Sequence, residues 1–153
     1  MAIEEAKAAR TELIQFLKNL CESDGYAVGA ILIDVRNDLV VLEHIKKVPS
    51  EIGPKSSGIE LSEGLLGKLI PALKELCSER SLNLGDPFFS IIMAQKGTAI
   101  IHILSMDWVI VVFGKKGLNI SYVVQQLAQS HPKIRSLIAK AKLRSEGIEG
   151  WSL

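Results

Sequence analysis

The chain of 153 residues and 16.7 kDa is long enough for one domain that buries about two thirds of the surface of its unfolded form. Apolar residues make up 48% and charged residues 23%, which excludes a wholly disordered or collagen-like chain. The longest apolar runs, such as 108–113, are far shorter than the ~18 residues of a membrane-spanning helix, and the charged first residues do not resemble a signal peptide. We therefore expect a cytoplasmic protein.

The first half of the chain predicts a helix, a hairpin, a long loop and a second helix. Apolar residues recur at three- and four-residue steps over 2–23, which is typical of an amphipathic helix. The β-rich segments 26–33 and 39–45 flank an Asn-Asp turn and predict two strands, and the Pro- and Ser-containing segment 46–60 predicts a loop. Helical spacing returns over 61–81, where Pro71 predicts either a kink or a helix that begins near Lys68.

The second half predicts three strands followed by helix. The runs 88–95, 98–105 and 108–114 are joined by two-residue turns, so they form a meander. A helical pattern begins at Asn119, breaks at Ser130-His131-Pro132 and resumes to Leu143, which gives an extra C-terminal helix. The predicted order is α-ββ-α-βββ-α with that addition. A hairpin and a meander together make five antiparallel strands in an α+β domain, with helices covering both faces of the sheet.

The motifs tested predict no catalytic residue, no metal ligand set and no cofactor. The stretch 64–69 resembles a phosphate-binding loop, but Ser62 and Leu69 replace the required glycine and Ser or Thr. The three histidines have no metal-ligand spacing, and Cys21 and Cys77 occupy apolar helix positions where a thiol is buried and inert. His102 alternates with apolar residues on one strand face, which indicates a hydrogen-bonded histidine in the core or in an interface. An enzyme is therefore the least favoured interpretation.

The C-terminal part of the chain is basic. Residues 114–153 carry seven basic and two acidic side chains, although the net charge of the whole chain is only +1. The final helix could bind an anionic polymer through phosphate contacts, but it lacks the interleaved aromatic residues of single-strand binders. A solvated or protein-facing surface is favoured over nucleic acid or anionic lipid. The candidate anion-binding residues are Lys133, Arg135, Lys140, Lys142 and Arg144.

Apolar residues of the middle helix and of the third strand have two interpretations. They form stripes at helical and strand spacing, so ordinary core packing explains them. Alternatively, the third strand lies at the edge of the sheet if the meander runs outward from the hairpin, and an unpaired apolar edge needs a cover, such as a symmetric partner. The candidate interface residues are Leu65, Leu69, Leu73, Leu76, Phe88, Phe89, Ile91 and Met93.

The element order and two segments resemble the Roadblock dynein light-chain family. Gly29–Val41 is similar to the first hairpin of that family, and Gly117–Val124 is similar to the Asn-centred entry into its last helix. The resemblance spans residues 2–130, so we divide the chain into a Roadblock-like domain, 1–130, and a basic extension and tail, 131–153. It implies the strand order 2-1-5-4-3, with the first and last helices on one face and the middle helix on the other.

The same resemblance implies a function. Members of the family are noncatalytic homodimeric scaffolds that bind small Ras-like GTPases, and their third strand and middle helix pair with the second copy. We therefore expect a homodimer that regulates or scaffolds such a GTPase. The alternative is a ligand-sensing PAS, GAF or profilin-like domain, which needs a cavity lined by groups such as His102 and Tyr26.

Overall fold

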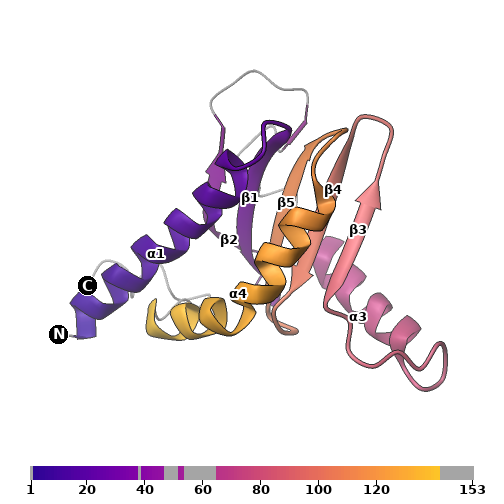
Figure 1. Ribbon diagram of the computed structural model, residues 1–153. Coiled ribbons are helices and arrows are strands. Elements are labelled where there is room, and N and C mark those ends of the chain that lie inside the picture. The colour runs from indigo at the N-terminus through magenta and orange to yellow at the C-terminus, as the bar shows by residue number, and fades with distance from the viewer. Residues whose placement is uncertain (1, 38, 47–51, 54–64, 142–153) are drawn as a thin grey trace.

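The computed structural model describes residues 2–37, 39–46, 52–53 and 65–141. It confirms the order α-ββ-α-βββ-α, and every strand begins and ends within two residues of its expected bounds (Figure 1). Most of the predicted loop 46–60 lies outside the described residues. The elements are α1 (Ala2–Glu22), β1 (Ala27–Asp34), β2 (Leu39–Ile45), α3 (Leu65–Cys77), β3 (Phe89–Met93), β4 (Gly97–Ile103), β5 (Trp108–Lys115) and α4 (Ile120–Ala141).

The five strands form one antiparallel sheet in the order β2-β1-β5-β4-β3, as expected. The first and last strands of the chain, β1 and β5, are neighbours in the middle of the sheet, and all eight residues of β1 are buried. Among the residues that the structure describes, strand β3 lies at one edge and pairs only with β4. The sheet therefore presents β3 as a strand with one side unpaired.

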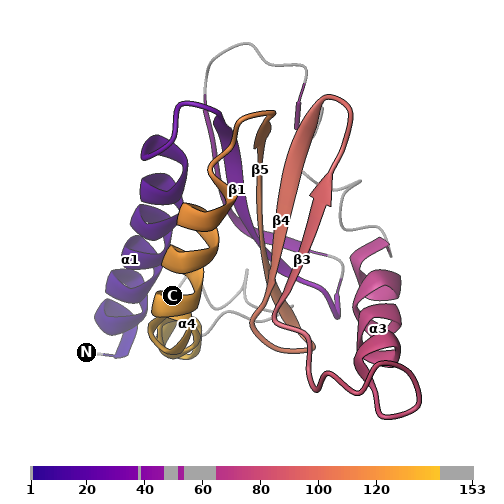
Figure 2. The same ribbon diagram turned by 45° about the vertical axis from the view of Figure 1, so that its right-hand side comes forward.

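Helices cover both faces of this sheet and divide the core in two. Helices α1 and α4 lie side by side on one face, and α3 lies on the other (Figure 2). Alternate residues of the central strands point to opposite faces, so Ala30 and Leu32 pack under α1 and α4, whereas Ile31 and Ile33 face α3. In the part of the chain that the structure describes, no helix is long and apolar enough to cross a bilayer.

The side chain of Asp24 joins the end of α1 to the start of α4. Its Oδ1 accepts a hydrogen bond from the Tyr26 amide at 2.8 Å, and its Oδ2 accepts one from the Asn119 amide at 2.7 Å. Asn119 in turn caps α4, because its Oδ1 accepts a hydrogen bond from the amide of Tyr122 at 3.1 Å. The Asn-centred helix entry seen in the sequence is thus an N-cap.

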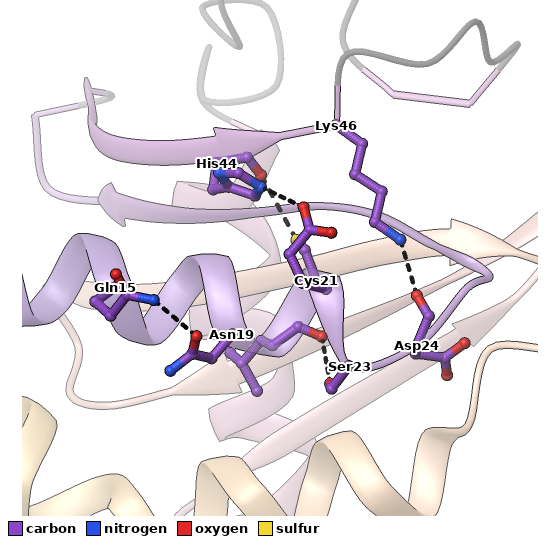
Figure 3. Close-up of polar contacts among 9 residues, drawn as sticks. Gln15, Asn19, Cys21, Ser23, Asp24, His44 and Lys46 are labelled. Carbon is purple, nitrogen blue, oxygen red and sulfur yellow. Dashed lines mark hydrogen bonds and ion pairs between the residues drawn. The ribbon is translucent and has the colours of Figure 1, made fainter.

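The last turn of α1 is also tied to β2 (Figure 3). His44 Nε2 lies 3.1 Å from Glu22 Oε1, and Lys46 Nζ donates a hydrogen bond of 2.9 Å to the carbonyl oxygen of Asp24. The Cys21 thiol donates to the carbonyl oxygen of His44 at 3.6 Å, and burial raises the pKa of this thiol to about 12. Cys21 is therefore the buried thiol that its helix position predicted, while Cys77 is half-buried.

Both helices that contain proline continue past it. The break predicted at Ser130–Pro132 is absent: α4 continues through Pro132 to Ala141, although it bends along its length (Figures 1 and 2). The reason is packing, because the apolar stripe of α4 resumes at Ile134 beyond the proline and reaches the same core, which offsets the lost backbone hydrogen bond. Helix α3 spans Leu65–Cys77 and holds Pro71 in its interior, so of the two alternatives predicted for this helix, the start near Lys68 is not observed.

Candidate interaction surface

Large apolar side chains are exposed mainly in one region of the described chain. Seven of the eleven exposed large apolar residues lie between positions 76 and 93, from the last turn of α3 to the end of β3. A concentration of this kind marks an interaction site more often than a plain solvent-facing surface. We call this set the edge surface, and its residues are Leu76, Leu82, Leu84, Phe88, Ile91, Ile92 and Met93.

The end of β3 is uncovered on both faces of the sheet. Ile91 pairs with Ile100 on the face of α1 and α4, whereas Ile92 pairs with Ala99 on the face of α3. Both side chains are nevertheless about half exposed, at 45% and 46%, and Met93 is 77% exposed. This strand therefore offers unpaired backbone groups and apolar side chains together.

The predicted interface residues fall into three groups in the structure. Leu76, Phe88, Ile91 and Met93 are exposed and belong to the edge surface. Leu69 and Leu73 are partly buried against the core beneath α3, and Phe89 is partly buried against the core on the opposite face. The side chain of Leu65 lies outside the described residues.

Sequence reasoning missed three residues of the edge surface. Leu82 and Leu84 belong to the segment between α3 and β3, and their signal was two leucines placed among turn-forming polar residues. Ile92 was missed because it lies on the strand face opposite to that of Ile91 and Met93. An edge strand can expose both of its faces, which a one-face pattern does not reveal.

A pair of histidines lies behind the start of this edge strand. His102 in β4 is 1% exposed, and its ring stacks on that of Phe89 with a centroid distance of 4.4 Å. Its Nδ1 lies 3.2 Å from the carbonyl oxygen of Phe88, and its Nε2 lies 3.1 Å from Nδ1 of His131 in α4. The strand pattern predicted a hydrogen-bonded histidine in the core or in an interface, and the structure places His102 in the core.

The hydrogen-bond partners fix which nitrogens carry protons. A carbonyl oxygen only accepts, so Nδ1 of His102 donates to Phe88, and the Nε2 of neutral His102 is an acceptor. Nδ1 of His131 must then donate to that acceptor. The result is a one-way chain of hydrogen bonds from α4 through β4 to the backbone of Phe88, just before β3.

Burial keeps both rings neutral at pH 7. It lowers the pKa of His102 to about 4, while the hydrogen bond to Phe88 opposes this change and the neighbouring His131 adds to it. The pKa of His131 is also lowered, first by partial burial and then by the charge of Arg135. Each ring can thus keep the single-proton form that the hydrogen-bond chain requires.

A pocket of ≈250 Å³ opens beside the histidine pair, between α3, α4 and the ends of β3 and β4. Phe88, Leu104 and Met106 contribute apolar wall, and His131 lines the same pocket. Its charged lining comes from three separate segments, with Lys74 on α3, Asp86 before β3 and Arg135 on α4. Phe88 also belongs to the edge surface, so the pocket and that surface adjoin.

The predicted basic residues of the final helix do not form one patch among the described residues. Lys133 lies 3.5 Å from Glu12 of α1 in an exposed ion pair, and Lys140, seven positions further, lies on the same side of the helix. Arg135 lies on another side, where it lines the pocket. Lys142 and Arg144 are outside the described residues.

The residues proposed for a ligand-sensing cavity are not brought together. Tyr26 is 53% exposed and packs near Gly117, where an added Cβ would lie 3.1 Å from its ring. The ring of His102 instead contacts Phe89, and both of its nitrogens are engaged. Within the described residues, no three His, Cys, Asp or Glu side chains gather as a metal site would require.

Comparison with known proteins supports the fold. No protein-family model matches the sequence, and no curated protein is similar to it. Among solved structures, a Roadblock/LC7 domain from Streptomyces avermitilis matches with a TM-score of 0.66 and 12% identity, over 82% of this chain and 97% of its own. MglB from Myxococcus xanthus matches with a TM-score of 0.67 and 12% identity, over 84% of this chain and 96% of its own.

The gliding protein MglB from Thermus thermophilus matches with a TM-score of 0.59 and 14% identity, over 92% of this chain and 93% of its own. These identities are low, so the likeness is one of three-dimensional structure. The chain has the fold of Roadblock/LC7 domains, as its sequence resemblance implied.

Proposed function

We propose that this protein is a noncatalytic cytoplasmic module that forms a homodimer through β3 and α3 and regulates or scaffolds a small Ras-like GTPase. The observation that carries the proposal is the edge surface, an apolar region on a strand with one unpaired side. An edge surface on a Roadblock/LC7 fold supports a small Ras-like GTPase as the partner, which is the class of partner that the sequence resemblance implies.

A second copy suits this edge on physical grounds. Antiparallel pairing of two β3 strands would satisfy the free backbone groups of both and extend the sheet across the dimer. The same pairing would remove Ile91, Ile92 and Met93 from water. Burial of their apolar area stabilises the dimer by about 25 cal/mol per Å². Residues of α3 would add to the contact, as the resemblance implies.

A scaffold without catalysis is what the sequence resemblance implies, and the proposal assigns the histidine pair a structural role. The two histidines with lowered pKa values are hydrogen-bonded to one another, and His102 is also hydrogen-bonded to the carbonyl oxygen of Phe88. A module of this kind acts by contact, so its effect on a GTPase would come from holding the GTPase or from reshaping its switch segments.

The dimer is tested by light scattering at micromolar concentration. The wild-type mass should be twice that of one chain, and Met93→Lys should give the mass of one chain, because it places a charge in an apolar contact. Ile3→Lys is the matched control, since Ile3 is 49% exposed on α1, far along the chain from β3, and should leave the dimer intact. A wild-type protein of single-chain mass would refute the dimer.

The GTPase role is tested with small Ras-like GTPases from the same organism, each loaded with GDP or with a non-hydrolysable GTP analogue. The dimer should bind at least one of them with a preference between the two nucleotide states, or should change its rate of nucleotide turnover. If the dimer forms but neither effect occurs, the GTPase assignment is wrong and the dimer assignment stands.

A further inference from the structure

The pocket beside the histidine pair has an unbalanced charge. Lys74 and Arg135 face it from two different helices, and Asp86 is the acidic residue among those that line it. Neither cation forms an ion pair with a described residue. The lining thus carries a net positive charge even while His131 is neutral.

His131 can accept a proton without breaking its bond to His102. Its Nδ1 donates to His102, so the free lone pair of the neutral ring is on Nε2, which has no hydrogen-bond partner among the described residues. A proton on this Nε2 leaves the Nδ1–H···Nε2 bond in place and makes it charge-assisted. His102 lacks this option, because Phe88 and His131 occupy both of its nitrogens.

The size and walls of the pocket restrict its occupant. At ≈250 Å³ it is smaller than the roughly 300–1,000 Å³ of typical small-molecule sites, and it suits a side chain or two of a partner protein. Phe88 and Met106 are both exposed at 62% and 44%, so apolar wall is available next to the cations. Continuity with the edge surface through Phe88 also favours a protein as the ligand.

We propose that this pocket binds an acidic side chain flanked by an apolar residue of a partner protein, and that His131 takes up a proton on binding. The carboxylate lies among Lys74, His131 and Arg135, and the apolar neighbour packs on Phe88 and Met106. This site does not depend on dimer formation or on the identity of a GTPase.

The charges around His131 explain the coupling to protons. Arg135 on the same helix repels a proton on His131, Lys74 on α3 and Asp86 before β3 place one positive and one negative charge in the same pocket lining, and His102 on β4 offers only an acceptor. A carboxylate bound among these groups offsets the two cations, which raises the pKa of His131 toward its ordinary range. By linkage, the ligand must bind more tightly as the pH falls across that range.

The test uses the full-length protein and two short peptides, N-acetyl-Phe-Glu amide and N-acetyl-Phe-Gln amide. The two peptides differ in charge and have nearly the same shape, so the difference between their affinities measures the contribution of the carboxylate to binding. Titration is followed by NMR signals of the histidine rings, which also give the pKa of His131. We expect the Glu peptide to bind about fivefold more tightly than the Gln peptide, and about threefold more tightly near pH 5.5 than near pH 7.5.

Three variants locate the effect. Arg135→Gln should abolish the preference for Glu, whereas Lys140→Gln, on the same helix but outside the pocket lining, should keep it. His131→Asn should retain binding and lose the pH dependence, because an amide can still donate to His102 but does not titrate. Equal affinities for the two peptides, or an unchanged Glu preference in Arg135→Gln, would overturn the proposal.

The same titration in Met93→Lys separates this site from the dimer. If that variant is monomeric and still prefers the Glu peptide, the pocket functions independently of self-association, as we propose. Loss of the preference in a folded Met93→Lys monomer would contradict this assignment and would place the site within the dimer contact instead.

Discussion

Acid should destabilise this protein through one buried side chain, His102. Burial lowers the pKa of His102 from 6.5 to about 4 in the folded protein. The unfolded chain therefore binds more protons than the folded one between these values, so stability is fully present above about pH 6.5 and falls as the pH decreases toward 4. A proton on Nε2 of His102 would also face the donor Nδ1 of His131.

The size of the effect follows from the two pKa values. They differ by about 2.5, and each pKa unit corresponds to about 1.4 kcal/mol. Protonation linked to His102 should therefore lower the free energy of unfolding by about 3 kcal/mol at pH 4. Domains of this size are commonly stable by about 5–15 kcal/mol, which makes this loss a large fraction of the total.

The assay is urea unfolding, followed by circular dichroism at a fixed protein concentration from about pH 7.5 to 4.5. Wild type is compared with His102→Gln, which can donate to the Phe88 carbonyl oxygen but does not titrate, and with His44→Gln, which removes a half-buried histidine of β2. His102→Gln should be less stable near neutral pH and should lose stability more slowly in acid. Parallel curves for wild type and His102→Gln would refute the reasoning.

Three further results are expected. Gly29→Val should destabilise the fold by more than about 2 kcal/mol in the same urea assay, because a Cβ at Gly29 would lie 2.5 Å from Cζ of Phe113, in the centre of the sheet. Asn119→Ala should cost about 1 kcal/mol through loss of the α4 cap, while Asn119→Asp should retain most of the stability. With a chromogenic disulfide reagent near pH 8, Cys77 should react in the folded protein and Cys21 only after unfolding, because burial raises the pKa of the Cys21 thiol to about 12; equal rates would contradict this.

Much of the fold could be predicted because its signals are local. Period-two and period-3.6 patterns locate the strands and helices, and β2 begins and ends where its sequence pattern does, at Leu39 and Ile45. Proline, by contrast, misled the prediction for α4. The sequence shows that Pro132 removes a backbone hydrogen bond from a helix. It does not show that Ile134 and Leu137 pack into the core and offset this loss, because that packing exists only in the folded protein.

The candidate sites were less accessible to sequence reasoning. Strand periodicity indicated that His102 is a histidine of the core or of an interface, yet its partner His131 is 29 positions away and belongs to another element. The pocket is harder still, since Lys74, Asp86 and Arg135 are separated along the chain by elements whose relative placement only the fold supplies. Residues that converge from separate segments leave no spacing signature.

The central place of β1 and β5 has a consequence for synthesis. Strand β1 leaves the ribosome well before its neighbour β5, which begins at Trp108, so the middle of the sheet cannot close until the segments between these two strands have emerged. Until then the growing chain carries the apolar strand β1 without its main partner. This long-range pairing predicts that the sheet folds only after β5 has been synthesised, and a chaperone bound to the Val-Gly-Ala-Ile-Leu-Ile segment at 28–33 would protect the chain from aggregation until then.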